Sequence, residues 1–368
     1  MKKDLILFYP SFERGGVEKI LENLIKKNNK FNITLISSKN AKKVINLKKI
    51  NFIEVKTIIK IPFIHMRYIS ALNGLLTLLK YLKNKSKDYI IHSMQSNVAA
   101  IIACIFKGNK IIIRNSENPI YSFLHSEGKF ISFISLLLKY FFYNFADGII
   151  TNSKGSKKSL EFFIFNKKKI VTIYNPYLNK LNKRNNKNNQ NSKFLISIGR
   201  LQKQKDHETL IRAFSIFHKK YSKFKLLILG HGKLEIKLKE LAKKLKIQDK
   251  IIFKGWVKNT LPYLKRSKIF VLSSVYEGLG NVLIDAINCN IPCVSTNCHS
   301  GPSEILLNGR GGYLVKIKSP KSLAKKISYC IDNYQEAIKK NQIARENLSR
   351  FLINNQSKKY FDYLSKYY

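Results

Sequence analysis

The chain has 368 residues, of which 45% are hydrophobic, so it can bury two ordinary domain cores and is neither a disordered tail nor a disulfide-held miniprotein. The formal net charge of +46 favours anionic partners, for which phosphate-bearing ligands, nucleic acid and an anionic membrane surface are candidates. Lysine is spread over the whole length with many Asn and Ile residues, so a genome-wide compositional bias is an equally good explanation of this charge.

The first half of the chain alternates short β-rich runs with helical patterns. The N-terminal apolar run covers only Leu5–Tyr9, which is too short for a signal peptide. Helices are predicted between the β-rich runs, as at Val17–Lys27 and Tyr68–Leu82. The strands themselves are rich in Ile, Leu and Val, so we expect a parallel sheet covered by helices on both faces. The predicted strands are Leu5–Tyr9, Ile33–Ser37, Tyr89–Ser93, Lys110–Arg114, Gly148–Thr151 and Ile170–Tyr174.

A strongly apolar run at Phe130–Leu138 ends at Lys139 and does not reach the length of a membrane span. The surrounding aromatic stretch Tyr121–Phe145 has two interpretations: a surface that docks on anionic lipid, or an ordinary packed helix. We therefore expect a protein that sits on a membrane at most and does not cross one.

Residues 178–192 are polar, basic and almost free of apolar side chains, which predicts a linker. The alternating pattern then restarts, with helices predicted at His207–Lys220, Leu234–Lys246 and Val282–Asn288. Two Rossmann-like domains, residues 1–178 and 193–349, follow from this periodicity, and ligands are expected at the carboxyl ends of their strands, in an interdomain cleft. The strands of the second domain are predicted at Phe194–Ile198, Lys225–Leu229, Ile251–Phe253, Ile269–Leu272, Pro292–Ser295 and Gly312–Val315.

The strongest local signal is Ser274–Asn288, where a strand ends, a glycine-containing loop follows and a helix begins. Gly278 and Gly280 allow close approach by a ligand, and amides at the helix start can bind a phosphate. The carboxylates of Glu277 and Asp285 can accept hydrogen bonds from sugar hydroxyls. The alternative is a simple turn whose acid merely caps the helix.

Two cations follow the first strand of the second domain. Arg200 and Lys205 lie in the loop before the helix that Asp206 is expected to start, where they can hold a diphosphate. The alternative is a pair of ordinary solvated cations. In the first domain, Gly15 and Gly16 stand at a strand-to-helix turn, which by itself indicates only a tight turn because it is not a GxGxxG motif.

No metal site is predicted. The five cysteines contain no CxxC and lack zinc-finger spacing, and no Asp-x-Asp occurs in the chain. Buried, reduced thiols are typical of a cytoplasmic protein.

Together these segments resemble the retaining GT-B glycosyltransferases called glycosyl transferases group 1, and especially bacterial enzymes that build O-antigen, capsule or lipid-linked glycans. They occur in the family's order and span nearly the whole chain. The segments are GGVEK (Gly15–Lys19), TNSKGS (Thr151–Ser156), GRLQKQKDHETLIRAF (Gly199–Phe214), LLILGHGKL (Leu226–Leu234), FKGWV (Phe253–Val257), YEGLGNVLIDA (Tyr276–Ala286) and SGPSEIL (Ser300–Leu306).

The resemblance implies a role for each matching position. Arg200 and Lys205 correspond to the basic pair that binds the donor diphosphate and stabilises the leaving group. Glu277 corresponds to the loop acid that contacts the donor sugar. The N-terminal glycine loop of the family, which closes over the donor, falls on Gly15 and Gly16.

Further donor contacts are implied around the second-domain loops. Gly280, Asn281 and Val282 correspond to the backbone that meets the phosphates. Trp256 and Val257 correspond to the segment beside the nucleotide base.

Two positions depart from the family pattern. Asp285 stands where the E-x7-E motif has its second Glu, which usually holds the ribose, and it is one methylene shorter. Many members carry a His after the fourth strand of the first domain, where this chain has Arg114 to Asn118. Asn115 is the nearest positional match there, and Glu117 is a second candidate for a catalytic role.

The resemblance therefore implies a GT-B enzyme that moves a hexose or N-acetylhexosamine, from a UDP-sugar as the favoured donor, to a glycan or lipid-linked acceptor. It implies retention of configuration, no cofactor or metal, no nucleic-acid partner, and a cytoplasmic enzyme placed at the inner membrane face. The C-terminal helix, about residues 350–368, is expected to pack back on the first domain. Alternatives are a nucleotide-sugar epimerase or a phosphorylase of the same fold and, from charge alone, a nucleic-acid-binding protein.

Overall fold

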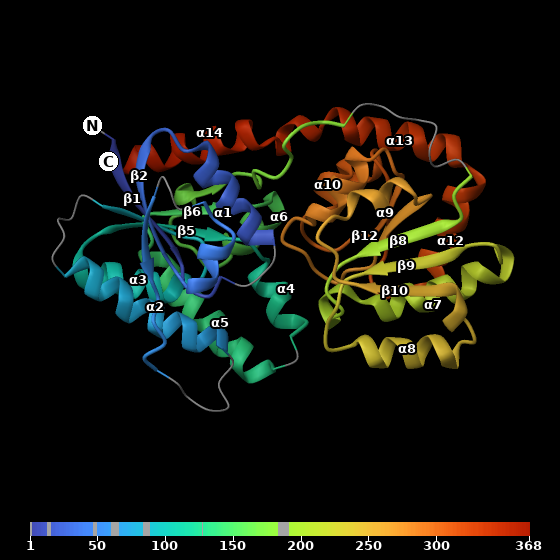
Figure 1. Ribbon diagram of the computed structural model, residues 1–368, viewed down its shortest axis with the longest axis horizontal. Helices are drawn as coiled ribbons and strands as arrows, with labels where there is room; N and C mark the ends of the chain where they lie inside the picture. Colours follow the sequence, from blue (N-terminus) through green and yellow to red (C-terminus); the bar gives the residue numbers. More distant parts are fainter. Residues whose placement is uncertain are drawn as a thin grey trace. The chain divides into compact units, whose positions relative to one another are not determined.

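The computed structural model describes residues 2–12, 16–46, 50–59, 66–83, 89–126, 128–182 and 191–368. The chain divides into two compact units, the first made of Met1–Asn179 with Arg350–Tyr368 and the second of Lys180–Ser349. Each unit contains one parallel sheet with helices on both faces (Figure 1). The predicted α/β class with two doubly wound sheets is confirmed.

The first sheet has seven strands in the order β3-β2-β1-β4-β5-β6-β7, and all its pairs are parallel. The six predicted strands are present, while the short, partly exposed edge strand β3 was not predicted. The strands are β1 (Lys3–Tyr9), β2 (Phe31–Ser37), β3 (Asn51–Glu54), β4 (Ile90–Ser93), β5 (Lys110–Asn115), β6 (Gly148–Thr151) and β7 (Ile170–Thr172).

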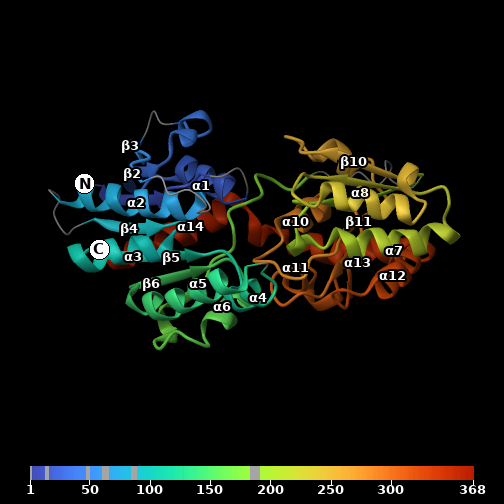
Figure 2. The same ribbon diagram turned by 90° about the horizontal axis from the view of Figure 1, so that it is seen from below.

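Helices cover both faces of this sheet because successive strand residues point to opposite sides. Leu5 and Leu7 of β1 join a cluster with α1 and α14, whereas Ile6 and Phe8 join a second cluster with α2, α3 and α6. Figure 2 shows α2 and α3 on one side of the strands. The helices are α1 (Gly16–Lys27), α2 (Met66–Leu82), α3 (Asn97–Lys107), α4 (Pro119–Leu124), α5 (Lys129–Phe142), α6 (Lys154–Leu160) and α14 (Ile353–Leu364).

The C-terminal helix α14 belongs to the first unit through buried contacts. The Arg114 guanidinium, which is 2% exposed, donates to the Tyr360 hydroxyl at 3.2 Å and to the Asn175 amide oxygen at 2.7 Å. The rings of Phe31 and Phe361 lie 5.8 Å apart. Removing α14 would therefore uncover one face of the sheet and leave a buried charge without its hydroxyl partner.

The second sheet has six parallel strands in the order β10-β9-β8-β11-β12-β13, at the positions predicted to within two residues. A cluster that includes Leu195, Ile228 and Val271 packs against α7, α8 and α12. The elements are β8 (Phe194–Ile198), β9 (Lys225–Leu229), β10 (Ile251–Gly255), β11 (Ile269–Leu272), β12 (Cys293–Thr296), β13 (Tyr313–Val315), α7 (His207–Lys220), α8 (Glu235–Lys244), α9 (Leu261–Lys265), α10 (Asn281–Asn288), α11 (Pro302–Ile305), α12 (Pro320–Asp332) and α13 (Tyr334–Glu346).

The two ends of the predicted linker are held to the units that they adjoin. Leu178 is buried and forms a parallel bridge with Leu352, and the Asn182 amide N–H donates to the Asn288 side-chain oxygen at 3.0 Å. Residues 183–190 of the linker lie outside the described residues. Among the helices that the structure describes, none has both the length and the apolar character to span a bilayer.

Candidate active site

The candidate site of the second unit lies at the carboxyl ends of β8 and β11. These strands are neighbours in the sheet, yet β8 is the first strand of the unit and β11 the fourth, so the strand order reverses between them. Ligands of doubly wound sheets bind at such a switch point. The motif segments Gly199–Phe214 and Tyr276–Ala286 follow these two strands directly.

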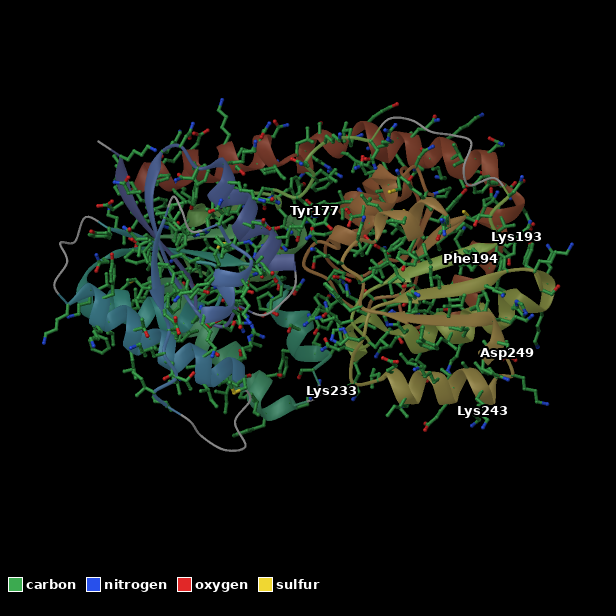
Figure 3. All side chains as sticks on the ribbon, in the orientation of Figure 1. Tyr177, Lys193, Phe194, Lys233, Lys243 and Asp249 are labelled. Atoms are coloured by element: carbon green, nitrogen blue, oxygen red, sulfur yellow. The ribbon has the colours of Figure 1, made fainter. Side chains whose placement is uncertain are left out.

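Figure 3 shows the polarity of this sheet. Lys193 and Phe194, where β8 begins, and Asp249, just before β10, lie toward one side of the second unit. Lys233, which follows β9, lies on the opposite side. The strands run from the first side to the second, so the candidate site is on the side that Lys233 marks.

An ion pair joins the two loops at the centre of the site. The Lys205 ammonium lies 2.5 Å from a Glu277 carboxylate oxygen, and the two side chains are only 15% and 6% exposed. The same oxygen accepts a hydrogen bond from the Ser274 hydroxyl at 2.6 Å. Both predicted residues are thus brought together, although 72 positions separate them in the sequence.

Further hydrogen bonds fix the backbone of the two loops. The Ser273 hydroxyl donates to the Lys205 carbonyl at 2.8 Å, and the Gln204 amide donates to the Tyr276 carbonyl at 3.1 Å. From β12 and its following loop, Thr296 donates to the Ser274 carbonyl and Ser300 to the Glu277 carbonyl. The ion pair therefore sits in a preorganised frame. Gln204, Ser274 and Ser300 belong to segments that the sequence had singled out, whereas Ser273 and Thr296 carried no signal beyond their position at the end of a strand.

Two glycines allow the backbone turns beside this frame. Gly280 has φ of 89° and precedes α10, so the loop can enter the helix directly after Glu277. Gly301 also has φ of 89°, and a Cβ there would lie 2.0 Å from the Leu279 carbonyl oxygen. Gly301 is therefore required by close packing as well as by its backbone conformation.

Arg200 is exposed at the carboxyl edge of the sheet, and no side-chain hydrogen bond or ion pair occupies it within the described part of the chain. Asp206 starts α7 as predicted, since its carboxylate accepts from the Thr209 amide at 3.1 Å and from the Thr209 hydroxyl at 2.7 Å. The loop before Asp206 thus contains the exposed Arg200 and the paired Lys205, with Lys203 between them.

The remaining donor-site predictions fall around the same edge. Asn281, Val282 and Asp285 occupy the first turns of α10 and are half-buried, as is Gly278 in the preceding loop. Trp256 follows β10 and is 55% exposed, and Val257 next to it is half-buried. Of the N-terminal glycines, Gly16 is the exposed first residue of α1, and Gly15 lies outside the described residues.

In the first unit, Asn115 ends β5, and its side-chain amide donates to the Glu117 carbonyl at 2.6 Å. The Glu117 carboxylate lies 2.5 Å from the Lys139 ammonium of α5. Burial alone would raise the pKa of Glu117, but the charges of Lys139 and Arg67 outweigh it and hold this pKa at about 2. Such a carboxylate is a weak general base near neutral pH, so Glu117 is better explained as an anchor of α5 than as a catalytic group.

Comparison with known families covers both units. Residues 14–177 match the family described as glycosyltransferase family 4, and residues 179–348 match the family described as glycosyl transferases group 1. Residues 1–13, Leu178 and residues 349–368 fall outside these two matches.

Individual proteins give the same picture. An uncharacterized glycosyltransferase of Methanocaldococcus jannaschii is 39% identical over 62% of this chain and 60% of its own length. A Campylobacter jejuni N-acetylgalactosamine-N,N'-diacetylbacillosaminyl-diphospho-undecaprenol 4-alpha-N-acetylgalactosaminyltransferase is 29% identical over 86% of this chain and 87% of its own. The structure of Anabaena HepE in complex with UDP-glucose superposes with a TM-score of 0.80 at 17% identity, covering 99% of this chain and 100% of HepE, which shows a shared fold.

Proposed function

The chain belongs to the glycosyltransferases in which a family 4 domain precedes a group 1 domain, and from this premise we propose that it transfers a hexose or N-acetylhexosamine from a UDP-sugar to a lipid-linked glycan acceptor. The observation that carries the proposal is the Lys205–Glu277 pair, held between two loops at the switch point of the second sheet. Arg200 adds an unoccupied cation at the same edge.

The donor diphosphate is the group that this site fits. Arg200 offers a fork of N–H donors, and the amides at the start of α10 point out of the helix end that favours negative charge. Glu277 is fixed by Lys205 and Ser274 and has a second carboxylate oxygen with which to accept from a sugar hydroxyl. In this arrangement Arg200 and the α10 amides would bind the phosphates, and Glu277 would bind the sugar.

In the proposed reaction the bond from the anomeric carbon to the diphosphate oxygen breaks, and the acceptor hydroxyl oxygen bonds to the same carbon while its proton passes to the departing diphosphate oxygen. The leaving UDP gains negative charge, which Lys205, Arg200 and the α10 amides stabilise from fixed positions. In this proposal the cations fill the role that a divalent ion has in other enzymes, so no metal is needed. Attack from the face that UDP leaves would retain the α configuration.

The acceptor class rests on the relatives. The Campylobacter relative acts, by its name, on a diphospho-undecaprenol-linked sugar, which is an anionic lipid-linked glycan. A cationic enzyme suits such a substrate, and we place the reaction at the inner face of a membrane, with the first unit presenting the acceptor. Asn115, at the end of β5, is the first-unit side chain that we assign to the acceptor hydroxyl.

Thermal shift with nucleotides tests the donor site. We expect UDP and UDP-N-acetylhexosamines to stabilise the protein, and Arg200→Ala to weaken UDP binding about 10- to 100-fold because a charge-assisted bidentate contact is lost. Arg266→Ala is the matched control, since Arg266 is also exposed but precedes β11 and lies at the opposite edge of the sheet. An unchanged UDP shift in Arg200→Ala would contradict the phosphate role.

A transfer assay tests the reaction itself. The enzyme is incubated with UDP-N-acetylhexosamine and a polyprenyl-diphosphate oligosaccharide, and the product is analysed by mass and by the anomeric NMR coupling. We expect one added sugar with an α linkage, also in the presence of a chelator. Donor consumption without any transferred sugar would point to an epimerase or phosphorylase instead.

A further inference from the structure

Helix α5 directs most of its large apolar side chains outward, unlike an ordinary surface helix. None of its 14 residues is buried, although its sequence is KFISFISLLLKYFF. The half-buried residues that face the protein include Ser132, Ser135 and Lys139, whereas Phe130 and Phe141 are 76% and 59% exposed. The other large apolar side chains on the outer face are Ile131, Phe133, Ile134, Leu137, Leu138 and Tyr140.

The orientation of α5 is fixed by its inner face. Lys139 forms the ion pair with Glu117 at 2.5 Å and is only 15% exposed. Leu136 and Phe142 pack against the core cluster that includes α3 and α6. For the helix to turn, the half-buried Lys139 ammonium would have to leave its carboxylate, and Leu136 and Phe142 would have to leave the core, so the apolar face stays directed outward.

The apolar surface continues beyond the helix. The rings of Phe141 and Phe145 lie 5.5 Å apart, and those of Tyr140 and Phe165 lie 6.4 Å apart, so the loop after α6 extends the surface. Phe145 and Phe165 are 52% and 78% exposed. A patch of this size, made largely of phenylalanine, marks an interaction site.

The charges around this patch are cationic. Lys129 begins α5, and Lys167 and Lys168 are exposed and follow Phe165 after one residue. Lys169 is half-buried and donates to the Asn144 and Ala146 carbonyls. The helix contains no acid. Of the acids near the patch in sequence, Glu117 pairs with Lys139 and Glu161 with Lys157, and the Asp147 carboxylate accepts from the Ile111 amide. An apolar surface edged by lysines matches the interface of an anionic bilayer, in which acyl chains lie beneath negatively charged headgroups.

We propose that the outer face of α5, together with Phe145 and Phe165, inserts into the headgroup region of an anionic lipid bilayer. This proposal rests on the proposed function in one respect, because bilayer binding would bring the first unit to an acceptor that is embedded in lipid. A second copy of the chain is the competing occupant, but the lysines at the edge of the patch would then face each other, which is unfavourable.

Vesicle co-sedimentation of the full chain tests the proposal, with vesicles of phosphatidylglycerol or of phosphatidylcholine alone. We expect binding to phosphatidylglycerol that weakens with salt, and much weaker binding to phosphatidylcholine. The variant Phe130→Ser, Ile134→Ser, Leu137→Ser removes one stripe of the outer face, and we expect its partition to fall at least about tenfold. The control Ile216→Ser, Ile236→Ser removes exposed apolar residues of the second unit and should bind like the wild type.

Two further measurements separate the possible outcomes. Absence of binding to phosphatidylglycerol, or equal binding by the triple variant, would overturn the proposal, as would self-association that the triple variant abolishes. The UDP-induced thermal shift should be unchanged in the triple variant, which shows that it is folded. Vesicle binding without transfer to a lipid-linked acceptor would refute the proposed function but would still support the membrane-binding role of α5.

Discussion

Gly280 and Gly301 have the same left-handed φ of 89° but different surroundings. The nearest atom to a Cβ at Gly280 would be 3.7 Å away, whereas at Gly301 it would be the Leu279 carbonyl oxygen at 2.0 Å. We expect Gly280→Ala to cost about 1–2 kcal/mol from backbone strain alone. We expect Gly301→Ala to cost more than about 3 kcal/mol because the loop must also move.

Chemical unfolding of the two variants checks this difference. Because the loop around Leu279 carries Glu277, we also expect Gly301→Ala to lose more of the UDP-induced stabilisation than Gly280→Ala does. Equal losses of stability in the two variants would show that the loop relaxes freely around residue 301.

The sequence identified candidate site residues, but it did not predict which of them pair. Arg200, Lys205 and Glu277 were identified by residue type and by their position after strands. Nothing in the sequence indicated that Lys205 and Glu277 neutralise each other, because that contact depends on β8 and β11 being neighbours. The Ser274 and Ser300 hydrogen bonds were missed for the same reason, since serine is common in any loop.

The Glu117–Lys139 pair is the polar contact that anchors helix α5. The pKa of Glu117, about 2, lies below its value in an unfolded chain, about 4.3. The stabilisation is therefore complete above about pH 5 and is lost as pH falls toward 2. Because a third of the Glu117 side chain is exposed, solvent screens the pair, and we expect Glu117→Gln to cost about 1–2 kcal/mol at pH 7.

Urea unfolding at pH 7, 5 and 3 measures this dependence. The difference between Glu117→Gln and the wild type should shrink at pH 3. Glu161→Gln is the control, since Glu161 is as exposed as Glu117, but its i,i+4 pair is 3.8 Å long and its partner Lys157 is more exposed than Lys139. We expect this substitution to cost less than about 0.5 kcal/mol. A Glu117→Gln difference that does not vary with pH would rule out the ion pair as its cause.

The limits of strands with a clear apolar run were predicted well, whereas the sequence did not predict which helix faces are exposed. Strands β6, β8, β9 and β11 have the predicted limits, because short apolar runs between helices leave little choice. The edge strand β3 was missed, since the tetrapeptide Asn51–Glu54 has no apolar run. For α5 the two interpretations stayed open, because the hydrophobic period identifies a helix and not the medium that its apolar face meets.

At the scale of the whole molecule, α14 completes the first unit from the far end of the sequence. Removing residues 350–368 would uncover the face that contains Leu5, Leu7 and Ile33. We expect amide hydrogen exchange to accelerate in β1, β2 and β4 of the truncated chain while β8 to β13 stay protected. Tyr360→Ala should give a weaker form of the same pattern, and equal acceleration in both units would contradict the division described here.

The alternation of strands and helices begins again after residue 192, and this repetition predicted two domains. Periodicity could not predict which of them the last helix joins, because an amphipathic stretch such as Ile353–Leu364 fits either sheet. The Arg114–Tyr360 contact and the Leu178–Leu352 bridge decide it, and both link residues that are more than 170 positions apart.

The late position of α14 also affects how the chain is made. A ribosome releases the N-terminal strands first, yet the helix that covers them emerges only after every strand of the second unit. The half encoded later has all of its own segments in one continuous stretch and can reach its native form earlier. Until α14 is made, the apolar face of the N-terminal sheet is exposed to solvent. We therefore expect chaperones to bind this unit during synthesis.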